Sequence, residues 1–172
     1  MGMSKKVLIF DTSVLCVWLE VPYKETFGSG EMVVDKTQID GIIEKERKAK
    51  STFVLPIASI IETGNHIAQS NGDNYGLACK FSDLLHKTAD EVSPWAAFTD
   101  QSELWKPEKL KLLATEWAAL APTRLSMGDV TIKHVAEYYA ESGFEVEIFT
   151  GDEGLKAYQP VAKPILQPRR RK

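Results

Sequence analysis

A short apolar run that ends directly in an acid is the feature that most constrains this chain. Residues 7–10 are Val-Leu-Ile-Phe, and Asp11 follows them without a spacer. An unbroken apolar run of this length is typical of a strand with both faces buried in a parallel sheet. A carboxylate at the end of such a strand is costly to bury unless a cation or hydrogen-bond donors meet it. That cost favours a functional role for Asp11.

Two further apolar runs predict strands, at residues 53–55 and 146–149, and Ile165-Leu166 predicts a fourth. Between them, apolar residues recur at three- and four-residue steps, which predicts amphipathic helices. The residues that form these steps are Ile39, Ile42 and Ile43; Ile60, Ile61 and Ile67; Leu77, Phe81, Leu84 and Leu85; Leu110, Leu113, Trp117 and Leu120; and Ile132, Val135, Ala136 and Tyr139. Strands that alternate with helices predict an α/β fold with a parallel sheet covered by helices.

Length and charge narrow the range of folds and partners. The 172 residues fit one domain, for which we predict residues 1–168, followed by a basic tail at 169–172. A net charge of -3 provides no general cationic field for a nucleic-acid backbone. Cys16 and Cys79 have neither CxxC spacing nor a nearby His, so we expect reduced, structural thiols. No apolar segment approaches membrane-spanning length, and we expect a cytoplasmic protein without a membrane partner.

Four acids fall at strand ends or in the first turns of the helices that follow. Besides Asp11, they are Glu62, early in the helix after Pro56; Asp129, three residues after Ser126; and Asp152, after Thr150-Gly151. Each has an ordinary explanation on its own: a surface Glu, a capping-box partner and a turn Asp, respectively. Taken together, they occupy the side of a parallel sheet where ligands bind, outside the carboxyl ends of the strands.

Several converging carboxylates without Cys or His form a hard-oxygen environment, which suits Mg²⁺ or Mn²⁺ better than zinc or copper. Such a site repels phosphate until a divalent ion is bound. With the ion in place, it can orient a water and stabilise both the attacking and leaving oxygens of a phosphoryl displacement. The four acids therefore predict phosphodiester hydrolysis.

At these positions the sequence resembles the PIN-domain ribonuclease family, over residues from about 6 to 166. Residues 7–15 resemble its first strand and first acid, residues 60–62 its second acid, residues 127–129 its third, and residues 148–152 its late strand followed by Thr-x-Asp. The resemblance implies a three-layer α/β/α fold with a central parallel sheet of about four to five strands. It also implies an RNA-cutting site in which Mg²⁺ or Mn²⁺ is bound by Asp11, Glu62, Asp129 and Asp152. Ser13 and Thr150 would be hydroxyls that orient the carboxylates or a metal-bound water, and Glu153 an adjacent acid that could assist.

By size the chain also resembles the family members that are toxins of toxin–antitoxin pairs. That resemblance implies a homodimer and an antitoxin protein as partner. The chain departs from this group by extra segments around residues 22–50 and 90–125. In the second segment Trp95, Phe98 and Trp105 lack a clean periodicity, which favours a packed irregular loop over a flap or a partner surface.

Two other functions compete with the nuclease. The first is a catalytically inactive PIN-like scaffold that binds protein or RNA; the presence of all four acids favours catalysis over it. The second is a haloacid-dehalogenase-like phosphatase, which needs a second Asp two residues after the first, where this chain has Ser13. None of His66, His86 and His134 lies beside a candidate nucleophile in the sequence, so we interpret all three as structural or surface residues.

Overall fold

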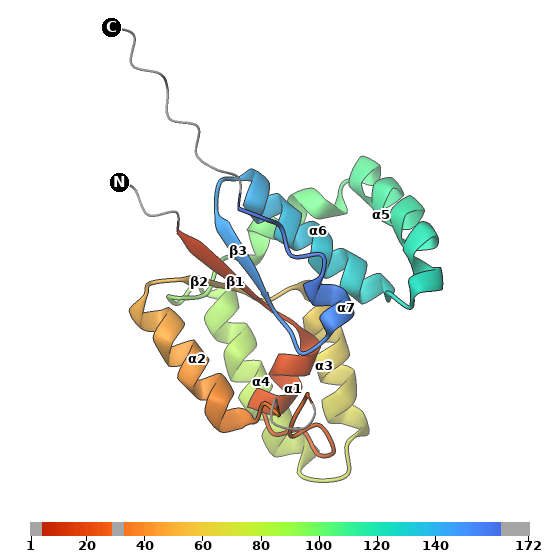
Figure 1. The fold of residues 1–172 in the computed structure, drawn as a ribbon. Helices are drawn as coiled ribbons and strands as arrows, with labels where there is room; N and C mark the ends of the chain where they lie inside the picture. The colour runs from red at the N-terminus through yellow and green to blue at the C-terminus, as the bar shows by residue number, and fades with distance from the viewer. Residues whose placement is uncertain (1–4, 29–32, 163–172) are drawn as a thin grey trace, which may run out of the picture.

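The computed structural model describes residues 5–28 and 33–162, and in them a three-stranded parallel sheet forms the centre (Figure 1). The strands are β1 (Lys6–Phe10), β2 (Thr52–Val54) and β3 (Glu145–Phe149), in the order β2-β1-β3. In the register, Ile9 of β1 lies beside Val54 on one side and Ile148 on the other. The three strands predicted from the apolar runs before residue 150 are confirmed.

The connections between the strands are helical. The α-helices are α1 (Thr12–Trp18), α2 (Lys36–Lys48), α3 (Ile57–Gln69), α4 (Asn74–Ala89), α5 (Pro107–Leu120), α6 (Met127–Glu141) and α7 (Glu153–Lys156). Two 3-10 helices, η2 (Phe98–Trp105) and η3 (Ala121–Thr123), flank α5. The five helices predicted from periodicity are confirmed as α2 to α6. None of the helices in the described ranges is both long and apolar enough to cross a bilayer.

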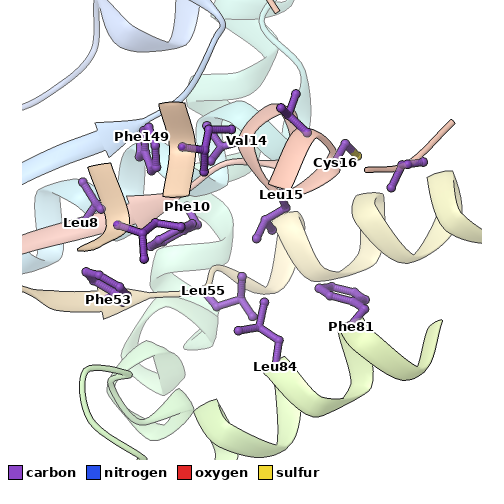
Figure 2. Close-up of a cluster of buried hydrophobic side chains, with 14 of the residues drawn as sticks. Leu8, Phe10, Val14, Leu15, Cys16, Phe53, Leu55, Phe81, Leu84 and Phe149 are labelled. Atoms are coloured by element: carbon purple, nitrogen blue, oxygen red, sulfur yellow. The ribbon is translucent and has the colours of Figure 1, made fainter. Parts of the chain in front are cut away.

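The two faces of β1 bury separate apolar clusters, because successive side chains of a strand point to opposite faces. Leu8 and Phe10 pack with α1, α2 and α4, where Figure 2 shows Leu15, Phe81 and Leu84 around them. Val7 and Ile9 pack on the opposite face with residues of α6, among them Ile132 and Val135. Helices therefore cover both faces of the sheet, and this explains why residues 7–10 are apolar throughout.

The described residues form three of the four to five strands expected for the sheet. At the outer edge of β2, Phe53 pairs with the segment around Trp95, through bonds from Phe53 N–H to the Pro94 carbonyl (2.8 Å) and from Ala96 N–H to the Phe53 carbonyl (2.9 Å). This isolated bridge takes the place of a strand. Trp95 is 8% exposed, as predicted for a packed loop, but Trp105 is 41% exposed and residues 98–105 form the 3-10 helix η2, so the prediction of an irregular packed loop is wrong for that part.

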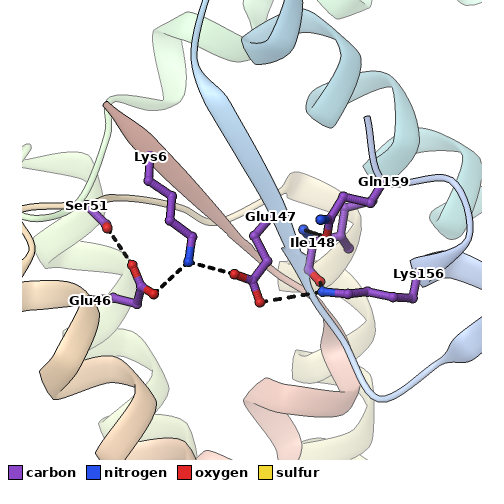
Figure 3. A network of polar contacts seen from close by, with 7 residues as sticks. All are labelled: Lys6, Glu46, Ser51, Glu147, Ile148, Lys156 and Gln159. Carbon is purple, nitrogen blue, oxygen red and sulfur yellow. Dashed lines mark hydrogen bonds and ion pairs between the residues drawn. The ribbon is translucent and has the colours of Figure 1, made fainter. Parts of the chain in front are cut away.

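At the outer edge of β3, side chains take the backbone groups that another strand would use. Ile148 N–H donates to Gln159 Oε1 (2.9 Å), and the Ile148 carbonyl accepts from Lys156 Nζ (2.8 Å), as Figure 3 shows. The predicted fourth strand at Ile165-Leu166 lies outside the described residues.

A partly buried ion-pair network fixes the first residue of β1. Lys6 Nζ lies 2.6 Å from Glu46 Oε1 of α2 and 2.7 Å from Glu147 Oε2 of β3 (Figure 3). Ser51 Oγ donates to the second oxygen of the buried Glu46 at 2.5 Å. The network joins α2, β1 and β3 at the amino end of the sheet, opposite to Asp11.

Candidate functional site

Asp11 lies at the carboxyl end of β1, where it is the N-cap of α1 and is 6% exposed. Its Oδ2 accepts hydrogen bonds from Ser13 Oγ (2.7 Å), Thr150 Oγ1 (2.7 Å) and, at 3.4 Å, Ser13 N–H. Hydrogen bonding to a buried carboxylate offsets the free energy lost by removing it from water. The donors come from α1 and from the residue after β3, so the burial of Asp11 depends on the fold around it.

The same two hydroxyls connect the end of β3 to α1. Thr150 Oγ1 accepts from Asp152 N–H (2.9 Å), and Ser13 Oγ accepts from Gly151 N–H (2.9 Å). The sequence analysis assigned Ser13 and Thr150 to orienting carboxylates, and the structure places both of them on Asp11. The turn that carries Asp152 is thereby fixed relative to Asp11.

Glu62 lies on α3 between α1 and the start of α6. Its Oε2 accepts from Thr12 Oγ1 at 3.0 Å. Gly128 of α6 lies so close that a Cβ atom placed on it would be 2.3 Å from Glu62 Oε1. Gly128 therefore leaves room for the Glu62 carboxylate, and Asp129 follows directly.

The negative charges of two of the acids raise the pKa of a third, Glu62. Burial raises the pKa of Glu62, the hydrogen bond from Thr12 lowers it, and the negative charges of Asp11 and Asp129 raise it again. The net result is a Glu62 pKa above its ordinary value. Repulsion of this kind is relieved by a cation between the carboxylates.

Asp129 and Asp152 both cap helices. Asp129 forms a capping box with Ser126: its Oδ2 accepts from Ser126 N–H (2.8 Å), and Ser126 Oγ accepts from Asp129 N–H (3.0 Å). Asp152 is the N-cap of α7, where its Oδ1 accepts from the N–H groups of Gly154 (2.7 Å) and Leu155 (3.2 Å). The ordinary explanations of these two acids, a capping box and a turn Asp, are therefore also correct. Glu153, in the first turn of α7, is exposed.

Each of the four acids uses only one carboxylate oxygen for hydrogen bonds with the described residues. The oxygens used are Oδ2 of Asp11, Oε2 of Glu62, Oδ2 of Asp129 and Oδ1 of Asp152. The fold therefore fixes one oxygen of each side chain and leaves the other available as a ligand. Carboxylate and hydroxyl oxygens are the donors that Mg²⁺ and Mn²⁺ prefer.

The donor types fit such an ion, but the side chains do not surround one point. Within the described ranges, no three His, Cys, Asp or Glu side chains are grouped closely enough to hold a metal ion. Among the predicted ligands, Asp11 and Asp129 lie near enough to Glu62 for their negative charges to raise its pKa. Asp152 connects to them through Thr150.

The sequence analysis did not single out Thr12, Gly128 or Phe27. Thr12 and Gly128 each adjoin a predicted acid, and that adjacency was the available signal. Phe27 lies over the turn after β3, since a Cβ atom on Gly151 would be 2.5 Å from its ring. Only the fold reveals that the loop carrying Phe27 borders the site.

The negative charges of the site also affect the pKa of Cys16, a buried residue of α1. Burial is the main cause that raises the pKa of the Cys16 thiol to about 11; the charge of Lys24 lowers it, and those of Asp11 and Glu62 add to the rise. Cys16 is a buried free thiol, as expected for a structural residue.

Comparison of the chain with protein-family models, with characterised proteins and with solved structures gives no match. The resemblance to the PIN family therefore rests on the residues quoted from the sequence and stays a prediction.

Proposed function

We propose that this protein is a metal-dependent ribonuclease that hydrolyses RNA phosphodiester bonds at the carboxyl end of its sheet. One observation carries the proposal: Asp11, Glu62 and Asp129 come from three separate elements, the negative charges of Asp11 and Asp129 raise the pKa of Glu62, and each acid keeps one oxygen outside the hydrogen bonds of the described fold. In open parallel sheets, ligands bind at this end of the strands.

The residues of the chain prepare the carboxylates before substrate arrives. Ser13 and Thr150 hold Asp11, and Thr12 holds Glu62, so that these acids need little reorganisation on binding. When bound by Asp11, Glu62 and Asp129, Mg²⁺ or Mn²⁺ supplies positive charge for the phosphate and lowers the pKa of a coordinated water. Asp152 is proposed as a fourth ligand from the turn after β3, with Glu153 as an assisting acid beside it.

The toxin role, the homodimer and the antitoxin partner follow from the family resemblance alone and stay predictions. The inactive scaffold remains the second candidate, because one observation favours it: Asp129 and Asp152 already cap helices and would be retained for that purpose without catalysis. Cleavage activity separates the two functions directly.

The experiment is cleavage of a mixed RNA pool by the purified protein with Mn²⁺, with Mg²⁺ and with EDTA, for wild type and Asp11→Asn. The amide oxygen of Asn can still accept the bonds from Ser13 and Thr150, so we expect a folded variant that no longer cuts. Asp35→Asn is the matched control, since Asp35 is an exposed N-cap aspartate of α2 and forms no hydrogen bond with any of the four acids. It should cut at the wild-type rate.

Three outcomes would each contradict a part of the proposal. Cleavage that persists in EDTA would exclude the metal, and cleavage by Asp11→Asn at the wild-type rate would exclude the proposed site. A well-folded protein that cuts under no condition would favour the scaffold.

A further inference from the structure

A cleft of about 820 Å³ lies at the amino end of the sheet, where β1 and β2 begin. Its cations are Lys5, directly before β1, and Arg47 and Lys50, from the carboxyl end of α2 and the residues after it. Segment 91–100 forms much of the remaining lining. The length of β1, roughly 15 Å, separates this cleft from Asp11.

The three cations lack acidic partners. Among the described residues, the side chains of Lys5, Arg47 and Lys50 take part in no ion pair and no hydrogen bond. Two further acids at this end of the sheet, Glu46 and Glu147, both bind Lys6 (Figure 3). The cleft thus keeps exposed positive charge in a protein of net charge -3.

Two acids line the cleft as well, and they do not cancel this charge. They are Glu91 and Asp100, against three cations. Asp100 Oδ2 already accepts a hydrogen bond from Tyr139 Oη at 3.4 Å. One net positive charge remains among the lining side chains.

Neutral donors complete the lining. The hydroxyls of Thr52, Ser93 and Thr99 face no hydrogen-bond partner among the described residues. The backbone beside them is anchored, because segment 94–96 bonds to Phe53 of β2. The cleft is therefore a preformed arrangement of cations and hydroxyls on a fixed wall.

The helix dipole alone does not explain this arrangement. Cations near a helix carboxyl end are favourable, and Lys45 and Lys48 satisfy that preference on α2 without lining the cleft. Lys5 precedes β1 and is not part of α2, so the dipole of α2 does not explain why a cation lines the cleft at this position.

We propose that this cleft binds a ligand with adjacent phosphate groups, either a soluble molecule such as a nucleotide or the backbone of a nucleic acid. Arg and Lys bind phosphate oxygens through charge-assisted hydrogen bonds, and hydroxyls donate to the same oxygens. The volume lies within the range of about 300–1,000 Å³ that holds small ligands. The proposal does not depend on the nuclease, because the cleft shares no residue with the acidic site.

The test is isothermal titration calorimetry of the full chain in EDTA with two probes, sodium pyrophosphate and a single-stranded thymidine decamer. EDTA prevents a divalent ion from attracting phosphate to the acids. We expect binding that Arg47→Gln and Lys50→Gln each weaken about tenfold, since each removes one charge-assisted contact. Lys111→Gln is the matched control, because Lys111 is exposed on α5 and likewise has no ion pair within the described ranges; it should bind as wild type.

The two probes distinguish the sources of phosphate. Pyrophosphate binding alone supports a soluble ligand, whereas tighter decamer binding that falls steeply with salt supports a nucleic-acid backbone. The proposal is overturned if neither probe binds, or if both glutamine variants bind as wild type does.

A second measurement keeps the proposal testable if a variant does not fold. In wild-type protein, pyrophosphate should shift the amide NMR signals of Thr52, Ala96 and Thr99. If only the signals of Asp11 and Thr150 shift, pyrophosphate binds at the acidic site, and the proposal that the cleft binds phosphate is overturned.

Discussion

Gly128→Ala should lower RNA cleavage at the proposed site while leaving the free energy of unfolding nearly unchanged. Gly128 is the second residue of α6, and the added Cβ would lie 2.3 Å from Glu62 Oε1 and 3.2 Å from Glu62 Cδ. Ordinary contacts begin at 3.4 Å, so the carboxylate oxygen must move by 3.4 minus 2.3, about 1 Å. The end of a flexible side chain can make this movement without disturbing the backbone.

The expected effects on stability and on activity differ greatly. Alanine is favoured over glycine inside a helix by about 1 kcal/mol, and an off-rotamer Glu62 costs about 0.5–1.5 kcal/mol. These contributions nearly cancel, so the free energy of unfolding should change by less than about 1 kcal/mol. A displacement of about 1 Å in a group that positions reactants can lower the rate on the order of 100-fold.

The assay compares Mn²⁺-dependent RNA cleavage with urea unfolding for wild type, Gly128→Ala and Gly64→Ala. Gly64 is the matched control because it lies on α3, two residues from Glu62, and a Cβ there meets nothing within 4 Å. Gly64→Ala should cut at the wild-type rate. If Gly128→Ala also cuts at that rate, Glu62 does not act in the site, and the reasoning is refuted.

Two further predictions concern the hydrogen bonds that hold the fold. Thr150→Val removes the donor to Asp11 Oδ2 and should lower the free energy of unfolding in urea by about 1–3 kcal/mol; Thr115→Val, which removes an exposed hydroxyl on α5, should change it by less than about 0.5 kcal/mol, and equal losses would contradict the prediction. Burial raises the pKa of Glu46, but its hydrogen bonds, led by that from Lys6, outweigh burial and hold the pKa below its ordinary 4.5. The stability that this pairing provides is present above pH 4.5 and is lost as pH falls through the lower, folded-state pKa. Glu46→Gln should therefore lose less stability than wild type as pH falls from neutral to below 4.5, and parallel profiles of unfolding free energy against pH would contradict this linkage.

Much of the fold follows from the spacing of apolar residues. Helices α2 to α6 each bury one side, so their apolar residues recur at helical steps. Helix α1 has no such pattern, because Val14, Leu15, Cys16 and Val17 are all buried. A helix that is apolar over consecutive residues resembles a continuation of the preceding strand, and this is why the sequence did not reveal α1.

The periodicity also assigned Leu110, which is 40% exposed, and Ile61 to the buried side of their helices. Ile61 was grouped with Ile60 and Ile67 as part of one apolar face, but it is 58% exposed, while Glu62 is partly buried. Glu62 takes the inward position because Thr12 of α1 donates a hydrogen bond to it and Gly128 of α6 leaves room for its carboxylate. Contacts between distant segments decide such a choice, and the spacing within one helix does not record them.

The groups that bond to the two edges of the described sheet could not be predicted from the sequence, for a similar reason. Whether an edge strand acquires a neighbour depends on which groups reach its free backbone positions. Here the segment around Trp95 forms hydrogen bonds with the outer edge of β2. The side chains of Gln159 and Lys156 bond to the backbone N–H and carbonyl of Ile148 at the outer edge of β3. Neither arrangement has a signature in the apolar pattern.

The acids could be predicted as a group because the carboxyl ends of parallel strands share one edge of the sheet. Their structural and proposed chemical roles do not compete. Asp129 and Asp152 each cap a helix through one oxygen, and helix N-termini favour the charged carboxylate. A cap fixes the orientation of the side chain through one oxygen, while the second oxygen remains outside the hydrogen bonds of the described residues. The caps that favour a scaffold thus also provide what a metal ligand requires, which is a carboxylate held in place by one oxygen with the other oxygen available for coordination.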